Sequence, residues 1–238
     1  MHRYPWLALV ARQFAGLPLR DFIEKSLTRL LGRWREVRVF RLMALDSGSL
    51  ADGGDGHDGG DGPGGALPAG FSARYIGEAE CLAFAAIADA GLREEFVRAA
   101  CARGDRCLAV FDGAEPAAYS WYADTATTLP GDLEIRFDPA WVYHYHSHTR
   151  PAWRGRRLHA AGVRAALRDV AAAGRPGLVS AVEVQNYESL RAMRRLGFRI
   201  IGSAYVAWFH GRPHIAHSPG CRRHAVRLAI DPQAPAPA

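Results

Sequence analysis

The sequence has almost no lysine: Lys25 is the only one, although 30 of its 238 residues are lysine or arginine. With 24 acidic residues the net charge is +6 and the pI about 9.4, so a polyanionic partner has to be considered. No basic run is interleaved with aromatic residues, as it would be on a nucleic-acid-binding face, and we expect no nucleic-acid partner. Arginine instead suits a small phosphorylated ligand, because its fork of donors matches phosphate oxygens.

Long apolar runs and paired cysteines are also missing. No segment approaches the roughly 20 apolar residues that a membrane span needs. The apolar stretch Trp6–Val10 is short and soon followed by Arg12, unlike a signal peptide. The four cysteines form no CxxC pair, which favours reduced thiols. These absences predict a soluble cytoplasmic protein; whether it forms a homodimer stays open.

Residues 1–50 are interpreted as an N-terminal extension of one helix and one strand. Helical spacing of apolar residues over Pro18–Trp34 predicts a helix that packs on its own domain, with weak contact with a membrane surface as the alternative. A short strand is expected at Val37–Leu42.

Residues 51–70 are so rich in glycine and aspartate that they cannot bury a core, which predicts a flexible linker. This linker contains GGxGxD, the pattern of calcium-binding repeats, formed by Gly53, Gly54, Gly56 and Asp58. That pattern works as stacked copies, each with an apolar residue in the interior. With one copy and no such residue, we expect no calcium site.

From residue 71 the pattern becomes regular, and we assign a single domain to residues 71–230, with 231–238 as a disordered tail. The order of expected elements predicts an α/β (α+β) fold, a mixed sheet with helices on both faces. The expected strands are Phe71–Ile76, Arg106–Phe111, Ala117–Tyr122, Trp141–Thr149, Leu178–Val184, Ile200–Phe209 and Ala225–Ile230. The expected helices are Glu78–Asp89, Leu92–Arg103, Arg156–Ala173 and Glu188–Leu196.

Three histidines, His144, His146 and His148, alternate along the strand Trp141–Thr149 and are expected on one face of it. Such a face can bind zinc, and a metal hydrolase would follow from it. No carboxylate in the same stretch would orient the histidines. A second cluster, in an expected terminal hairpin, consists of His210, His214, His217, Cys221 and His224. Its spacings match no tight ligand pattern, so we expect no metal at either place.

An arginine-rich junction follows this strand. Pro151 ends the strand pairing, and Arg154, Arg156 and Arg157 lead directly into the next helix. Free backbone N–H groups at a helix start, reinforced by the helix dipole, form an anion site. The order strand, proline, arginine, glycine, helix therefore favours a pyrophosphate-binding loop.

This junction, Thr149-Arg150-Pro151-Ala152-Trp153-Arg154-Gly155-Arg156-Arg157-Leu158-His159, resembles the acetyl-CoA loop of the GCN5-related N-acetyltransferases. Downstream, Asn186-Tyr187-Glu188-Ser189 and then Leu196-Gly197-Phe198 are similar to the second signature of that family. The resemblance covers residues 71–230 and implies a mostly antiparallel sheet. It also implies acetyl-CoA as the acyl donor and transfer to an amine, here of a small molecule or a peptide.

The resemblance implies a role for individual residues. Backbone groups of Ser147, His148 and Thr149 would bind the acetyl and pantetheine part, and Asn186 would hold the pantetheine arm, with Ser189 facing the thioester. The pyrophosphate would be wrapped by Arg154, Gly155, Arg156, Arg157, Leu158, His159 and Ala160.

Three residues depart from the family pattern. Arg157 stands where the family prefers glycine, and His159 where it prefers glycine or alanine. Met193 stands where many members place the tyrosine that protonates the leaving thiolate. Ser189, Tyr187 or an ordered water would then do that work. The alternative is a degenerate domain that binds CoA or a partner without turnover.

Attack by an amine needs a base that removes the ammonium proton. His146 and Glu183 are the first candidates, and the sequence does not separate them. His144 is also placed near the expected acceptor, and Tyr145 could relay a proton through water. The acceptor itself cannot be read from the sequence.

Overall fold

The structure, a computed structural model, describes residues 37–50, 67–209, 212–223 and 225–232. The expected helix at 18–34, the GGxGxD stretch, His210 and His224 lie outside these residues. Within them, no helix is both long and apolar enough to cross a membrane, and all four cysteines are free.

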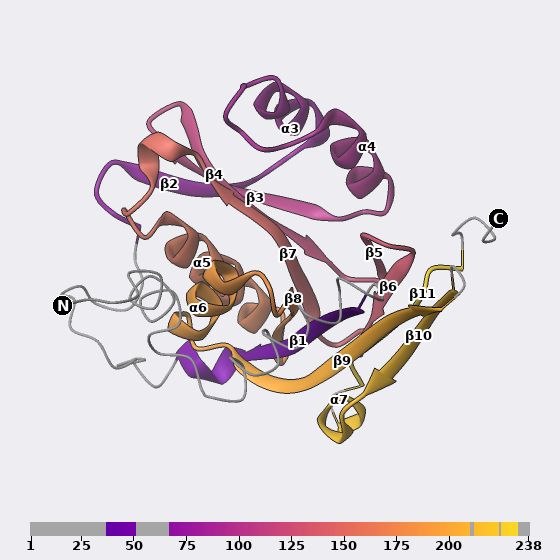
Figure 1. Cartoon of the computed structure of the whole chain (residues 1–238). Helices are drawn as coiled ribbons and strands as arrows, with labels where there is room; N and C mark the ends of the chain where they lie inside the picture. The colour runs from indigo at the N-terminus through magenta and orange to yellow at the C-terminus, as the bar shows by residue number, and fades with distance from the viewer. Residues whose placement is uncertain (1–36, 51–66, 210–211, 224, 233–238) are drawn as a thin grey trace, which may run out of the picture.

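Eight strands form one sheet, in the order β10-β9-β1-β8-β7-β4-β3-β2. Neighbouring strands are antiparallel except β7 and β8, which are parallel. The predicted mixed, mostly antiparallel sheet is therefore confirmed (Figure 1). The strands are β1 (Val37–Asp46), β2 (Phe71–Ile76), β3 (Arg106–Asp112), β4 (Glu115–Ala123), β7 (Val142–Thr149), β8 (Gly177–Glu183), β9 (Arg199–Phe209) and β10 (Arg212–His217).

Helices cover both faces of this sheet, because its central strands are apolar on both sides. On β3, Leu108 belongs to one buried cluster with α5 (Leu158–Ala172) and α6 (Tyr187–Arg195). The preceding residue, Cys107, belongs to a different buried cluster, which includes residues of α3 (Glu78–Ala85) and α4 (Glu94–Ala102). Successive residues of a strand point to opposite faces, so the two helix pairs lie on opposite sides, as Figure 1 shows.

A second, three-stranded sheet was not predicted from the sequence. It consists of β5 (Thr127–Leu129), β6 (Leu133–Arg136) and β11 (Arg227–Ile230), and it covers the half of the large sheet that α3 and α4 leave open (Figure 1). Leu133 and Ile135 of β6 are fully buried in a cluster with residues of β1, β8 and β9. The remaining short elements are η1 (Ser47–Leu50), η2 (Pro151–Trp153) and α7 (Pro219–Arg223).

Strand β1 lies inside the large sheet, between β8 and β9. Phe40 is in register with Glu183 on one side and Ala204 on the other, and Leu42 and Met43 are completely buried. The strand is longer than the expected Val37–Leu42 because its apolar pattern continues to Asp46. The domain boundary at residues 51–70 stays a prediction, but β1 is part of the same sheet as the strands that follow it.

Candidate active site

A β-bulge interrupts β7 at the position of the histidines. Tyr119 of β4 faces His148, whereas Trp121 faces Tyr145, so β7 has one residue more than β4 between these pairs. His146, in the bulge, has a φ of 44°, in the left-handed region. An extra residue in one strand shifts all later side chains to the other face.

The expectation that the three histidines share one strand face is therefore wrong. His144 is directed toward α5, with its ring 5.7 Å from that of His159. His146 is directed toward α4, with its ring 4.2 Å from that of Phe96. Regular alternation would place the neighbouring residues Tyr145 and His146 on opposite faces. Tyr145 nevertheless contacts Phe96 as well, with 6.0 Å between the ring centroids. The bulge thus places His146 and Tyr145 together and separates both from His144.

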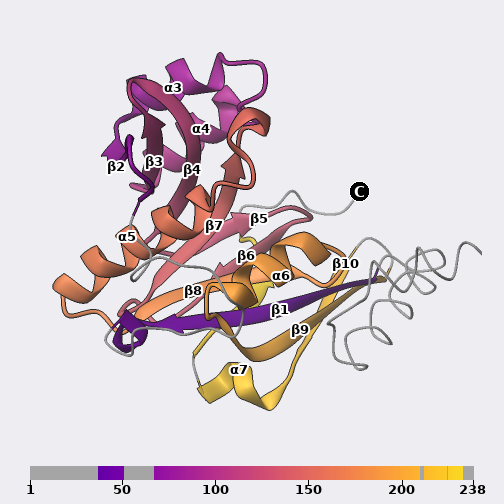
Figure 2. The same ribbon diagram turned by 90° about the vertical axis from the view of Figure 1, so that its left-hand side faces the viewer.

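Strands β7 and β8 separate immediately before this bulge. Their parallel pairing is limited to Val142↔Leu178 and Tyr143↔Val179. Beyond these pairs, β7 keeps β4 as its neighbour and β8 keeps β1, and the two strands diverge (Figure 2). Beyond Tyr143 and Val179, the backbone groups of residues 144–149 and 180–183 no longer pair with each other, so those on the facing edges of the two strands do not take part in a β7–β8 ladder.

The arginine-rich junction lies at the end of β7, as predicted. After the short turn of η2, Arg154 and Arg156 are exposed, and α5 begins at Leu158. No side chain caps the N-terminus of α5 and no acidic residue occurs in its first turn. The unsatisfied N–H groups and the positive end of the helix dipole therefore meet the arginines, an arrangement suited to a phosphate group.

Two residues of this loop need a left-handed backbone. Gly155 has a φ of 80° and Arg157, the N-cap of α5, a φ of 59°. Glycine adopts such a conformation freely, but in a residue with a Cβ it is strained. Arg157 therefore meets the backbone requirement that glycine would otherwise meet, and its guanidinium adds charge to the loop.

Arg150, to which the sequence gave no role, fixes the end of β7. Its Nε donates to Asp89 at 2.7 Å, and Nη1 donates to Glu115 at 3.1 Å and to the Pro116 carbonyl at 2.9 Å. Its guanidinium also lies 4.6 Å from the Trp153 ring centroid. No local pattern marks this residue, because its partners come from two distant turns.

His146 is the best placed of the predicted bases. It is exposed, and its Nε2 lies 3.4 Å from the Tyr119 hydroxyl, which donates its own proton to the Gly91 carbonyl. Nε2 must then be the protonated nitrogen, which leaves the Nδ1 lone pair as the proton acceptor. Although the residue is exposed as a whole, its ring packs against Phe96 and Tyr119, and desolvation there, with smaller effects of His148 and Arg93, lowers the pKa of His146 to about 4. The imidazole is therefore neutral at pH 7.

The other residues of this face are held by hydrogen bonds. Tyr145 donates to the buried carboxylate of Asp105 at 2.5 Å, and Arg103 donates to the same oxygen at 2.7 Å. Burial, reinforced by this bond, raises the pKa of Tyr145, so it stays protonated and cannot act as a base at neutral pH. His148 is bonded through Nε2 to the Asp89 carbonyl at 3.0 Å.

Glu183 is held in a bidentate ion pair. Arg38 donates to its two carboxylate oxygens, at 3.2 and 2.9 Å. This arginine fork occupies both oxygens that a general base would use. Of the two residues predicted as bases, Glu183 is thus engaged in an ion pair, whereas His146 is exposed.

The second signature forms the start of α6. Asn186 is its N-cap, and the side-chain oxygen accepts the Ser189 N–H at 3.2 Å. This bond leaves the amide N–H groups of Asn186 to reach a ligand. Met193 is buried in the core below α6, so its position supplies packing and no group for chemistry.

Three predicted residues are directed inward. Leu158 is 1% exposed and anchors the start of α5, and His144 is 3% exposed. The Nε2 of His159 is buried, and burial lowers the pKa of His159 to about 4 and that of His144 to about 3. The structure thus places the side chain of His159 beneath the loop, where it does not project toward a pyrophosphate.

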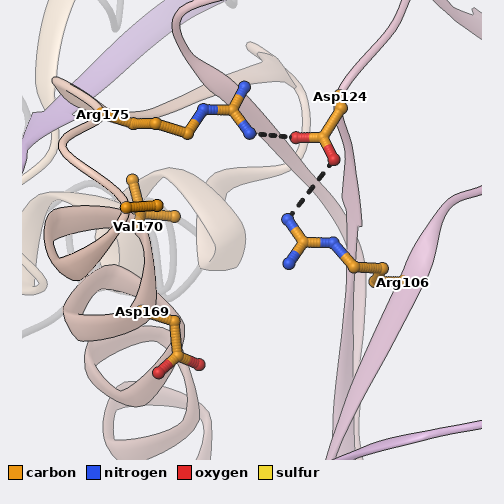
Figure 3. Close-up of a pocket in the computed structure, with 6 residues that line it drawn as sticks. Arg106, Asp124, Asp169, Val170 and Arg175 are labelled. Carbon is orange, nitrogen blue, oxygen red and sulfur yellow. Dashed lines mark hydrogen bonds and ion pairs between the residues drawn. The ribbon is translucent and has the colours of Figure 1, made fainter.

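A cavity of about 360 Å³ lies at the opposite end of α5 (Figure 3). Asp124 pairs there with Arg175 and, at 3.5 Å, with Arg106, so the charges are largely paired within the protein. A helix of the length of α5 separates the cavity from the arginine loop by about 20 Å. We therefore do not assign it to the candidate site. Its lining residues are Arg106, Asp124, Asp169, Val170, Ala173 and Arg175.

Within the described residues, no three His, Cys, Asp or Glu side chains are arranged to bind a metal ion. The bulge separates His144 from His146, and His217 accepts a hydrogen bond from the Leu228 N–H at 3.0 Å.

No family model matches the sequence, and neither does any curated protein. Among solved structures, a Drosophila protein is 14% identical, covers 80% of this chain and 58% of its own, and has a TM-score of 0.46. The Salmonella typhimurium acetyltransferase yncA, described with its cofactor acetyl-CoA, is 17% identical over 71% of this chain and 98% of its own, with a TM-score of 0.40. A GCN5-related N-acetyltransferase from Sphaerobacter thermophilus is 16% identical over 81% and 56%, with a TM-score of 0.44.

Several similar structures are GCN5-related N-acetyltransferases. This is the family that the two sequence motifs resemble. The chain spans less than two thirds of the Drosophila and Sphaerobacter structures.

Proposed function

We propose that the protein transfers an acetyl group from acetyl-CoA to the primary amine of a small molecule or peptide. One continuous stretch, residues 143–160, carries this proposal. It contains the divergence from β8, the bulge, the arginine loop and the uncapped start of α5. Strand edges that no longer pair with each other, followed directly by an anion site at a helix start, match the chemistry of a pantetheine attached to a pyrophosphate.

In this proposal the pantetheine arm lies between β7 and β8, along the backbone groups of Ser147, His148 and Thr149. Asn186, at the start of α6, bonds the arm through its amide N–H groups. The pyrophosphate lies at the N-terminus of α5, where backbone N–H groups are uncapped. Arg154, Arg156 and Arg157 neutralise its charge.

The amine attacks the thioester carbonyl carbon directly in a ternary complex. Nδ1 of neutral His146 takes the ammonium proton, directly or through water, and a tetrahedral oxyanion forms. Its collapse breaks the carbon–sulfur bond and releases the thiolate of CoA. The new amide nitrogen then loses its second proton, and Ser189, near the start of α6, is the candidate that relays a proton to the thiolate, giving its own proton to sulfur while it accepts the one released from nitrogen, directly or through water.

The test measures CoA release across a panel of amines and thermal melting with acetyl-CoA, CoA and ADP. Wild-type protein is expected to be stabilised by all three and to release CoA with at least one amine. His146→Gln should lower kcat about 100-fold, with the KM for acetyl-CoA unchanged. His214→Gln, at an exposed histidine of β10 outside the proposed site, should keep the activity. No stabilisation by any of the three ligands would overturn the proposal.

A binding module without turnover is the second candidate, and one observation favours it. The buried side chain of Met193 supplies no proton to a leaving thiolate, and Arg157 and His159 change the loop. Stabilisation by CoA without transfer to any amine would select this alternative.

A further inference from the structure

Three side chains form a hydrogen-bonded chain from the interior to the exposed bulge. Ser120 of β4, 3% exposed, donates to the Ser147 hydroxyl oxygen at 3.0 Å. Nε2 of His144, also 3% exposed, lies 2.9 Å from the same oxygen. Ser147 itself is exposed. Two buried groups therefore hold one solvent-facing hydroxyl at the point where β7 and β8 have separated.

The protonation of His144 determines what this hydroxyl can do. Burial keeps the imidazole neutral, so only one of its nitrogens carries a proton. Nδ1 is buried with no hydrogen-bond partner. An unpaired buried N–H is rarer than an unpaired buried acceptor, so the proton belongs on Nε2, which donates to Ser147.

The Ser147 oxygen then accepts two hydrogen bonds, from Ser120 and from His144. A hydroxyl has two acceptor lone pairs and one proton. With both lone pairs occupied, the proton of Ser147 is the group left to make a bond outward. The network thus makes Ser147 a hydrogen-bond donor and weakens it as a nucleophile.

The bulge places this donor opposite the proposed base. Ser147 and His144 are on the α5 side of β7, the side of the arginine loop, whereas His146 is on the α4 side. A thioester bound where β7 and β8 separate would have the two groups on opposite sides. Such an arrangement lets a base act on the attacking amine while a separate donor acts on the acyl oxygen.

We propose that the Ser147 hydroxyl donates to the acyl oxygen of the bound thioester and stabilises the oxyanion, with His144 and Ser120 as the residues that position it. This inference rests on the proposed acetyl transfer and adds a specific catalytic residue to it. No covalent bond forms to Ser147: the acyl group passes from sulfur to the amine nitrogen, and the hydroxyl keeps its proton throughout.

The first experiment compares Ser147→Ala with Ser147→Thr. Removal of one oxyanion donor typically lowers kcat by about 100-fold or more, so Ser147→Ala should lose that much with the affinity for CoA unchanged. Ser147→Thr keeps a hydroxyl and should retain most of the activity. His144→Gln, which keeps a donor near Nε2, should remain more active than His144→Phe at equal CoA affinity. Equal kcat for wild type and Ser147→Ala overturns the inference.

The second experiment does not need turnover. The wild type should bind a ketone analogue of acetyl-CoA, which keeps the carbonyl, more tightly than the thioether ethyl-CoA, and Ser147→Ala should lose this preference. If both analogues bind but Ser147→Ala changes neither affinity, the inference falls and the proposed function stands. If neither binds wild-type protein, both fall.

Two further observations would overturn the inference alone. One is an acetyl adduct on Ser147, detected by mass spectrometry after incubation with acetyl-CoA, which would make the residue a nucleophile. The other is a nitrogen NMR spectrum in which Nδ1 of His144, and not Nε2, carries the proton.

Discussion

At the scale of single residues, the candidate site contains two residues other than glycine whose backbone has the left-handed conformation that glycine adopts most easily. Arg157 has a φ of 59° and His146 a φ of 44°. Each is held by its surroundings, Arg157 as the N-cap of α5 and His146 by the pairing of β7 with β4. Strain of this kind concentrates at functional sites, and its energetic cost can be measured.

Arg157→Gly should stabilise the protein by about 1 kcal/mol, because glycine removes the cost of the left-handed backbone. Urea unfolding without ligand measures this change. Arg156→Gly is the matched control: Arg156 is not among the residues with positive φ, so glycine there only adds freedom to the unfolded chain and should not stabilise. Equal effects of the two substitutions would contradict the role of the backbone.

The buried histidine His144 predicts a loss of stability in acid. Burial lowers its pKa from 6.5 to about 3, so between these values the unfolded chain binds a proton that the folded protein does not. The contribution of neutral His144 to the free energy of unfolding is therefore fully present above pH 6.5. Below pH 6.5 it decreases by about 1.4 kcal/mol for each pH unit. Urea unfolding at pH 7.5 and 5.5 should show a smaller loss for His144→Gln than for wild type. Equal losses would show that His144 is not buried in its neutral form.

At the scale of elements, the sequence predicts what local periodicity encodes. The helix expected at Arg156–Ala173 is α5 at Leu158–Ala172, and the strands expected at Arg106–Phe111 and Ala117–Tyr122 are β3 and β4. Strands β5 and β6 were missed because three or four residues are too few for a period to be recognised. The helix expected at Glu78–Asp89 ends at Ala85, and Asp89 pairs instead with Arg150.

The bulge could not be predicted for a different reason. Alternation along Tyr143–Thr149 is regular in the sequence, and the extra residue exists only relative to β4. The arginine loop was therefore predicted correctly in position. The faces on which the three histidines lie were predicted wrongly, and the pairing of Glu183 with Arg38 was not predicted.

The junction of β7, the α3–α4 loop and the β3–β4 turn should depend on Arg150. Arg150→Met removes charged hydrogen bonds to two carboxylates and should destabilise the protein by about 2 kcal/mol. Arg154→Met, at an exposed arginine of the same loop with one bond to the Thr149 carbonyl, should change stability by less than about 0.5 kcal/mol. Urea unfolding without ligand distinguishes them. A cost as small for Arg150 as for Arg154 would show that the junction is held by packing alone.

At the scale of the whole molecule, the sheet is assembled from both ends of the chain. β1, from the start of the described residues, lies between β8 and β9, from the second half. The sequence predicted a strand there but gave no sign of its neighbours, because pairing over such a distance leaves no local pattern. The described fold is therefore not contained in residues 71–230 alone.

A chain that begins at residue 51 should fail to fold, because β8 and β9 lose their common neighbour and the core loses Leu42 and Met43. A chain that begins at residue 37 keeps every contact described above and should unfold cooperatively. Circular dichroism and urea unfolding of the two truncations test this. Cooperative unfolding of the shorter chain would mean that residues 71–230 fold as an independent domain.

The place of β1 also determines when the large sheet can form during synthesis. Arg38 and its partner Glu183 are 145 residues apart, so a ribosome that adds 5–20 residues per second needs about 7 to 29 seconds between them. During that time the apolar strand has emerged and its two neighbours do not yet exist. The large sheet therefore cannot close around β1 before β8 and β9 have been synthesised, and until then the apolar side chains of β1 lack the neighbours that bury them.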